Sequence, residues 1–304
     1  MIAHEADILA AVRQHLGALA NNARIEIAPL TIKPHRPRDY FRISVSLGDR
    51  KHATKRLFAK TGKGIVGCIR LEQRLARLQG ELNTPRLLAV RDLSSTTQLA
   101  LWTYEGGETR PINELGQREA DQLVRAHATV HSLSRELVSD PDIPHQSPWP
   151  AEPVMHVVAD AASSLGRLDL ERWARELTTL ETELLLRNSR NRPRWLTHHD
   201  IAIDNVHWRG AKPLILDWES VAYAPPATGL WPLVDLPERI FAQSMRVYSG
   251  LTLSLGHAIT PDEAAMFARF SHAQRSLAFG YRLKDSEKLE AGLSALESLR
   301  ANLL

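Results

Sequence analysis

The sequence contains a single cysteine, Cys68, among 304 residues. One thiol cannot form an intramolecular disulfide, so nothing in the sequence indicates an oxidising compartment. Runs of about 18 apolar residues, the length that spans a bilayer as a helix, do not occur, and we therefore expect no membrane segment. No internal repeat and no low-complexity tract is visible either.

The amino-terminal segment carries Glu5 and Asp7 and lacks a basic stretch followed by an apolar core. We expect an amphipathic helix there, not a signal or transit peptide, and a cytoplasmic protein. With 43% apolar and 24% charged residues, the composition is close to that of soluble globular domains and excludes a disordered or fibrous chain. The length suits two lobes or two modest domains.

The net charge of +3 is distributed unevenly along the chain. Residues 1–104 contain 17 Lys and Arg against 8 Asp and Glu, a balance of +9, and residues 105–304 contain 21 against 27, a balance of −6. A basic half favours a polyanionic partner such as nucleic acid or nucleotide phosphate, and the alternative is ordinary solvated surface. Charge counts alone leave both interpretations open.

Short β-like runs and turns alternate over the first hundred residues, in the order of three strands, a helix and two strands. The strands with assigned ranges are 40–47, 56–60, 86–90 and 98–104, and the helix is 69–79. Beyond residue 105 the pattern becomes helical, over residues 118–137, 171–187 and 230–304. The last of these stretches is broken near Pro261 and Lys284. A β-like island lies between the second and the third stretch. The boundary near residue 105 predicts an α+β chain, with a small β-rich lobe at 1–104 and a larger helical lobe at 105–304.

The β-like island, residues 195–218, contains the pattern His198-x-Asp200-x-x-x-x-Asn205. Asp217 follows twelve residues later and begins the triplet Asp-Trp-Glu. This arrangement resembles the catalytic loop and metal-binding aspartate of the aminoglycoside phosphotransferase and choline kinase group, relatives of the protein kinases. The resemblance implies a two-lobed protein-kinase-like fold and an ATP-dependent (or GTP-dependent) small-molecule kinase.

The resemblance also implies a role for each residue of the pattern. Asp200 would be the catalytic base that accepts or orients the proton of the substrate hydroxyl, and His198 would support the loop. Asn205 and Asp217 would hold Mg²⁺ ions that bridge the nucleotide phosphates, a task that suits amide and carboxylate oxygens. Phosphoryl transfer needs in-line positioning and neutralised phosphate charge, and these residue types supply both.

A kinase-like small lobe also needs a strand lysine for the α- and β-phosphates and a helix glutamate that pairs with it. Lys60 at the end of a predicted strand and Glu72 in the following helix have the required order. Residues 102–107 resemble the hinge that meets the adenine, which places Tyr104 and Glu105 at the nucleotide. His127 and His131 lie in the segment that resembles the long helix before the catalytic loop, and we expect them to be packing residues.

Two positions depart from the family pattern. The phosphate-covering loop should lie just before Tyr40, yet residues 35–41 contain no glycine, so coverage would depend on Arg36, Arg38 or backbone groups. About a dozen residues beyond Asp-Trp-Glu, where the family usually has Asp-Leu, the chain has Gly229-Leu230. The second departure concerns a residue pair that anchors the local structure in the family, more than it concerns the catalytic chemistry.

Other functions fit the sequence less well. His199-Asp200 with His207 also matches a metal-dependent phosphohydrolase. Such sites bind metal from helices, whereas residues 195–217 have a β-like pattern. Gly62 and Gly67 have the spacing of a P-loop, but Cys68 and Ile69 stand where Lys and Ser or Thr are required. A non-catalytic kinase-like nucleotide-binding protein remains an alternative. We expect no nucleic-acid partner, because no aromatic-interleaved basic stripe is present.

The acceptor is not encoded in a recognisable motif. A sugar, choline, an amino alcohol, or an aminoglycoside or other antibiotic all remain open, and an amine-bearing natural product, with a role in antibiotic resistance, is the leading expectation. It rests on the −6 balance of residues 105–304 and on Glu238, Asp262 and Glu263, which are expected near the acceptor side. The oligomeric state is not predicted.

Overall fold

The computed structural model describes residues 4–30, 38–47, 54–63, 84–104, 106–134, 195–201, 203–218, 221–256 and 258–303. The chain splits into two compact units. The first unit consists of residues 1–108, 207–209 and 214–219, and the second of residues 109–206, 210–213 and 220–304. The helices expected at 69–79 and 171–187 lie outside the described residues.

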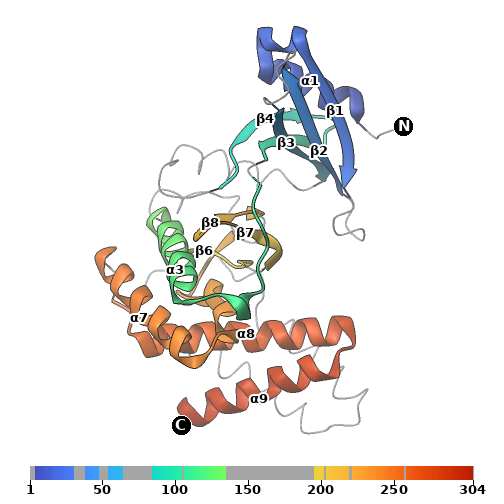
Figure 1. The fold of residues 1–304 in the computed structure, drawn as a ribbon. Helices are drawn as coiled ribbons and strands as arrows, with labels where there is room; N and C mark the ends of the chain where they lie inside the picture. The colour runs from blue at the N-terminus through green and yellow to red at the C-terminus, as the bar shows by residue number, and fades with distance from the viewer. Residues whose placement is uncertain are drawn as a thin grey trace. The chain divides into compact units, whose positions relative to one another are not determined.

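The first unit contains an antiparallel sheet (Figure 1). Among the described residues its strand order is β1-β2-β3-β5-β4, with bounds β1 Ala23–Leu30, β2 Arg38–Leu47, β3 Thr54–Lys63, β4 Leu87–Asp92 and β5 Thr97–Thr103. The strands expected at 40–47, 56–60, 86–90 and 98–104 are confirmed as β2 to β5, each with slightly different ends. β1, in which Ile25 and Ile27 alternate with Arg24 and Glu26, brings the strands before residue 69 to the expected three; its range was not assigned from the sequence.

The two faces of this sheet have different surroundings. Helix α1 (Glu5–Leu16) covers one face, where Ile8 and Val12 belong to a buried apolar cluster with Ile43 and Leu101. The other face carries Lys60, whose register partners are Tyr40 on β2 and Ala100 on β5. Strand alternation therefore separates the apolar core of the unit from the face that carries its buried lysine.

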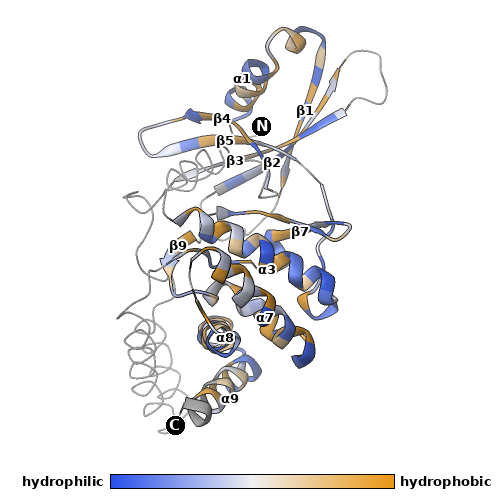
Figure 2. Ribbon diagram, turned by 90° about the vertical axis from the view of Figure 1, so that its left-hand side faces the viewer, coloured by the Kyte–Doolittle hydropathy of each residue, from blue (hydrophilic) through white to orange (hydrophobic). Residues whose placement is uncertain are grey.

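The second unit is built around helices and two short strands. Its described elements include α3 Gln117–Ser132, β6 Trp195–His198, β9 Val221–Ala224, the 3₁₀ segments η4 Ile203–Asn205 and η6 Thr228–Asp235, and α7 Glu238–Ser254, α8 Pro261–Leu283 and α9 Ser286–Leu303. Figure 2 shows polar and apolar residues on different sides of α3 and α7, as expected for helices with one buried face. Strands β7 (Val206–Arg209) and β8 (Lys212–Ile215) pair with each other, and the unit boundary runs through this hairpin. The described residues also include the 3₁₀ segments η1 Gly17–Asn22 and η3 Ile112–Glu114.

Helix α8 begins and ends where the sequence indicates. At its start, Thr260 accepts from the backbone N–H of Glu263, and the Glu263 side chain accepts from that of Thr260, a reciprocal capping box. Pro261 occupies the first helical turn, where a missing N–H has no cost. At its end, Lys284 adopts the left-handed conformation with φ 54°, which stops the helix. The breaks expected near Pro261 and Lys284 are thus confirmed.

Within the part of the chain that the structure describes, no helix is both long and apolar enough to cross a bilayer.

Candidate active site

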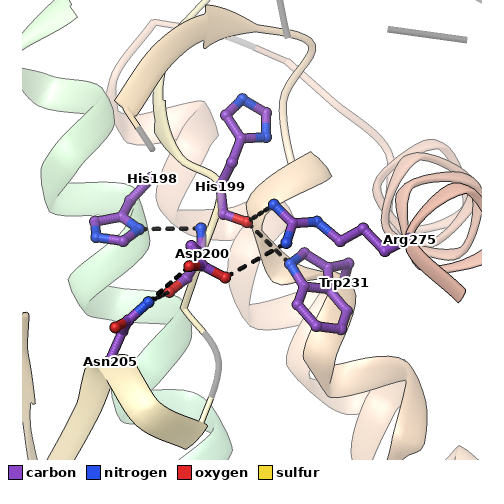
Figure 3. Close-up of polar contacts among 6 residues, drawn as sticks. All are labelled: His198, His199, Asp200, Asn205, Trp231 and Arg275. Atoms are coloured by element: carbon purple, nitrogen blue, oxygen red, sulfur yellow. Dashed lines mark hydrogen bonds and ion pairs between the residues drawn. The ribbon is translucent and has the colours of Figure 1, made fainter. Parts of the chain in front are cut away.

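The turn at His199-Asp200 follows directly from the buried strand β6. β6 pairs antiparallel with β9, and all four of its residues are buried, so the end of the strand is fixed in the second unit. His198, the last strand residue, accepts through Nδ1 a hydrogen bond from the backbone N–H of Asp200, at 3.2 Å. Figure 3 shows this contact and the side chains around the turn. The ring that sequence resemblance assigned to loop support therefore bonds the loop itself.

The Asp200 carboxylate is held at both oxygens. The Asn205 amide Nδ2 donates to Oδ2 of Asp200 at 2.8 Å and to the backbone oxygen of the same residue at 2.9 Å. Arg275 donates to Oδ1 at 3.4 Å. The Asp200 side chain is nevertheless 27% exposed. A carboxylate that is fixed in direction and still reachable can accept a proton from a bound hydroxyl.

Arg275 is a site residue that the sequence motifs did not identify. Its side chain is 1% exposed, and its guanidinium also donates to the backbone oxygen of His199 and lies 4.6 Å from the ring centroid of Trp231. Trp231 Nε1 donates to the same His199 oxygen at 3.0 Å. Burial lowers the pKa of Arg275 to about 10, and Asp200 opposes that shift, so the group is a cation at neutral pH.

Helix α3 bonds β6 through the buried side chain of His131. His131 Nδ1 donates to the backbone oxygen of Leu196 at 2.7 Å, and its Nε2 accepts from the Tyr248 hydroxyl at 2.7 Å. His127 is fully buried beside it, and burial lowers its pKa well below the usual 6.5, so its ring is neutral. Both histidines therefore pack inside the second unit, as expected from their place in the sequence.

Gly229 lies where no side chain fits. A Cβ atom at this position would stand 2.3 Å from Cε1 of His127, 2.4 Å from the backbone oxygen of His198 and 3.0 Å from Cγ2 of Thr197. The departure Gly229-Leu230 thus has a physical reason, because α3, β6 and η6 approach one another here with only a hydrogen atom between them. The end of β6 and the turn that carries Asp200 depend on this approach.

The remaining described site residues lie in the first unit. The Lys60 ammonium is 3.5 Å from Oδ1 of Asp217 and 5.8 Å from the ring centroid of Tyr40, and its side chain is 7% exposed. Asp217 has φ 55°, a conformation rare for a residue with a side chain. Backbone strain of this kind is concentrated at functional sites. Trp218 follows and donates from Nε1 to the Thr84 hydroxyl at 3.0 Å.

Some expected site residues fall outside the described part of the chain, namely Glu72, Glu105 and Arg36. The backbone of Arg38 begins β2, but its side chain is not described. Tyr104 is described and donates its backbone N–H to the oxygen of Arg56 at 3.1 Å.

Two of the acidic residues expected near the acceptor bond residues at or in α8. Glu263 completes the capping box, and Glu238 accepts two hydrogen bonds from Arg269, at 2.7 and 2.8 Å. The Glu238 carboxylate therefore has a cationic partner, and the Glu263 carboxylate accepts from the backbone N–H and hydroxyl of Thr260.

One comparison with known proteins identifies a family. A family model described as "Phosphotransferase enzyme family" matches residues 65–267, more than half of the chain. No curated protein matches the sequence.

Solved structures with the same fold cover nearly the whole chain. APH(2")-IIia, in a complex with GDP and kanamycin, is 15% identical with a TM-score of 0.60, over 99% of this chain and 100% of that one. A choline kinase from Cryptosporidium parvum is 12% identical with a TM-score of 0.62, over 98% and 96%. A macrolide 2'-phosphotransferase from Brachybacterium faecium is 16% identical with a TM-score of 0.56, over 97% and 98%. These similarities confirm the α+β, two-lobed kinase-like fold.

Proposed function

The chain belongs to the phosphotransferase enzyme family, and from that premise we propose that it moves the γ-phosphoryl group of ATP or GTP to a hydroxyl group of a small molecule. The observation that carries the proposal is the Asp200 carboxylate, held by Asn205 at one oxygen and by Arg275 at the other, yet 27% exposed. A base in a phosphotransferase has to be fixed in direction and reachable by the hydroxyl.

In the proposed reaction Asp200 accepts the hydroxyl proton as the acceptor oxygen forms its bond to the γ-phosphorus. The bond from that phosphorus to the β–γ bridging oxygen breaks, and the nucleoside diphosphate leaves. Such a positioned base contributes roughly 10²–10⁴-fold in rate. His198 and Asn205 act through Asp200, because each bonds the loop backbone or its carboxylate.

Lys60 is proposed to bind the donor phosphates. It is a buried cation on the sheet face opposite α1, so an incoming phosphate would meet it in surroundings where charge is poorly screened. Tyr40, Phe58 and Trp102 form an aromatic row around it, with ring centroids 6.1 and 6.0 Å apart. Aromatic faces stack nucleobases of any type, so this row supports nucleotide binding without choosing between ATP and GTP.

Asn205 and Asp217 are proposed as ligands of Mg²⁺. Asn205 turns its amide nitrogen toward Asp200 (Figure 3), which points its amide oxygen away from that carboxylate. An amide oxygen and a carboxylate are each a hard oxygen donor of the kind Mg²⁺ takes, so each residue suits such an ion. When bound, Mg²⁺ would neutralise negative charge on the donor phosphates.

For the acceptor we propose a hydroxylated, amine-bearing compound, of which aminoglycosides are the leading class. The support is the excess of acidic residues, 27 against 21, over residues 105–304. Asp235 is an exposed acid in this region, and it bonds His272. Metabolic acceptors such as choline, sugars and amino alcohols form the alternative.

Transfer of label from γ-labelled ATP, in the presence of Mg²⁺, to a panel of acceptors tests the function. The panel contains aminoglycosides, choline, amino alcohols, neutral sugars and macrolides. We expect labelled product with amine-bearing acceptors, and a KM for them that rises between low and moderate salt, since the screening length is about 8 Å at physiological ionic strength. Product from neutral acceptors alone would contradict the acceptor class and leave the transferase standing. No product from any acceptor would contradict the function.

A further inference from the structure

One cation in the second unit has no part in the sequence motif and still bonds the catalytic loop at two points. Arg275 comes from the middle of α8, 75 residues beyond Asp200 in the chain. Its guanidinium bonds the Asp200 carboxylate through one terminal nitrogen and the backbone oxygen of His199 through the other. A planar fork of this kind fixes two acceptors relative to each other, which a single ammonium group cannot do.

We propose that Arg275 is a positioning residue, which holds the Asp200 carboxylate in the orientation that accepts the acceptor's proton. The inference rests on the proposed function and deepens it. The last torsion of an aspartate side chain is broadly distributed, so contacts at both oxygens restrict the direction of the carboxylate more than one contact does. Asn205 holds Oδ2 of Asp200, and Arg275 donates to Oδ1.

The surroundings of Arg275 fit a positioning role better than a role in stability alone. The guanidinium is 1% exposed, and burying a charge is costly unless it is paired, so a hydrophobic residue would serve simple packing as well or better. The same helix shows the contrast. Arg269, six residues earlier, pairs with Glu238 at the surface, where the two side chains are 36% and 74% exposed. Pairs of that exposed kind contribute little.

Trp231, in η6, contacts both Arg275 and the backbone oxygen of His199. Its ring lies 4.6 Å beneath the guanidinium, and its Nε1 donates to the same His199 oxygen that Arg275 bonds. The Trp231 ring restricts movement of the guanidinium perpendicular to the ring, and the His199 oxygen restricts the direction in which the guanidinium points. The backbone oxygen of His199 therefore accepts from both Trp231 and Arg275, and the Asp200 carboxylate accepts from Arg275.

A double-mutant cycle on the full chain tests the inference. The variants are Arg275→Met, which keeps the side-chain length without the fork, Asp200→Asn, and the two together. Arg269→Met is the matched control, because it removes an arginine of the same helix that bonds Glu238 at the surface. Turnover is measured as ATP consumption with the best acceptor of the panel, KM for ATP is measured beside it, and thermal unfolding shows that each variant is folded.

We expect Arg275→Met to lower kcat by about 10- to 100-fold, since a misplacement on the order of 1 Å can cost that much, with KM for ATP changed by less than about twofold. In the Asp200→Asn background the same change should lower kcat by less than about twofold, because its effect acts through the missing carboxylate. Arg275→Lys should recover part of the loss. Arg269→Met should keep the wild-type rate.

Three results would overturn the inference. The first is an Arg275→Met variant that turns over like the wild type while Asp200→Asn is inactive, which leaves the proposed function intact. The second is an equal fractional loss from Arg275→Met in both backgrounds, which indicates a purely structural role. The third is an absence of turnover in the wild type with every acceptor, which removes the proposed function and the inference with it.

Discussion

Replacement of Gly229 by alanine tests how strictly the second unit fixes the end of β6. The new Cβ would stand 2.3 Å from the His127 ring and 2.4 Å from the backbone oxygen of His198. Non-bonded heavy atoms prefer separations of about 3.5–4.0 Å, so the neighbours must retreat by more than about 1 Å. Neither can do so easily, because His127 is fully buried and the His198 oxygen belongs to a strand paired with β9.

Overpacking of this kind costs about 1–3 kcal/mol and more where backbone must move. For a chain of this size we expect the Tm to fall by about 2–4 °C per kcal/mol. Because the displaced atom lies two residues before Asp200, turnover should fall by about 100-fold, the effect of a misplacement near 1 Å. Nucleotide affinity should change little, since Lys60 and its neighbours belong to the first unit.

The matched control is Gly250→Ala. Gly250 is exposed on α7, and a Cβ there meets nothing within 4 Å. Alanine in a helix interior stabilises the folded chain by roughly 0.5–1 kcal/mol relative to glycine. This variant should therefore unfold at the same or a slightly higher temperature, with unchanged turnover. Differential scanning fluorimetry and a turnover assay on both variants check the reasoning. A Gly229→Ala variant as stable and as active as Gly250→Ala would refute it.

Three further outcomes follow from individual contacts. Asp217→Ala should abolish Mg²⁺-dependent nucleotide binding together with activity, measured by titrating ATP with and without the ion; an unchanged response to Mg²⁺ would remove Asp217 from the metal site. Thr260→Ala removes the capping box of α8 and should lower stability by about 1 kcal/mol in denaturant unfolding, whereas equal stability would show that the cap contributes nothing. Burial holds the pKa of His127 and His199 well below 6.5, so below that pH the unfolded chain binds protons that the folded chain does not. Stability should therefore fall as pH drops from 7 to 5, by up to about 1.4 kcal/mol per group and pH unit, and His127→Leu should flatten the slope of Tm against pH.

Local signals in the sequence located most of the described elements. Alternating apolar residues identified β2, and Pro261 and Lys284 marked both ends of α8, because these features act over a few residues of chain. The spacing from Asp200 to Asn205 likewise places two side chains on one loop, where they form a hydrogen bond. Elements and loops of this local kind are predictable without knowledge of the tertiary fold.

Contacts between distant segments were not predictable in the same way. The bond between Arg275 and Asp200 spans 75 residues and depends on how α8 packs. The available signal was one of the three arginines in the sequence of α8, and a helix pattern does not say what such a cation faces. Charge counting did not reveal the partners of Glu238 and Glu263, one of which bonds Arg269 and the other the start of α8. Net charge describes long-range fields and does not assign residues to sites.

The most direct test of the account compares Asp200→Asn with Asp204→Asn. Both replace a carboxylate by its isosteric amide four residues apart, and Asp204 is exposed on η4 without a role in the proposed reaction. Turnover with the best acceptor and ATP affinity are measured for both. We expect Asp200→Asn to lose roughly 10²–10⁴-fold in kcat while ATP affinity stays near the wild-type value, and Asp204→Asn to keep the wild-type rate. Wild-type turnover in Asp200→Asn would contradict the assignment of Asp200 as the base.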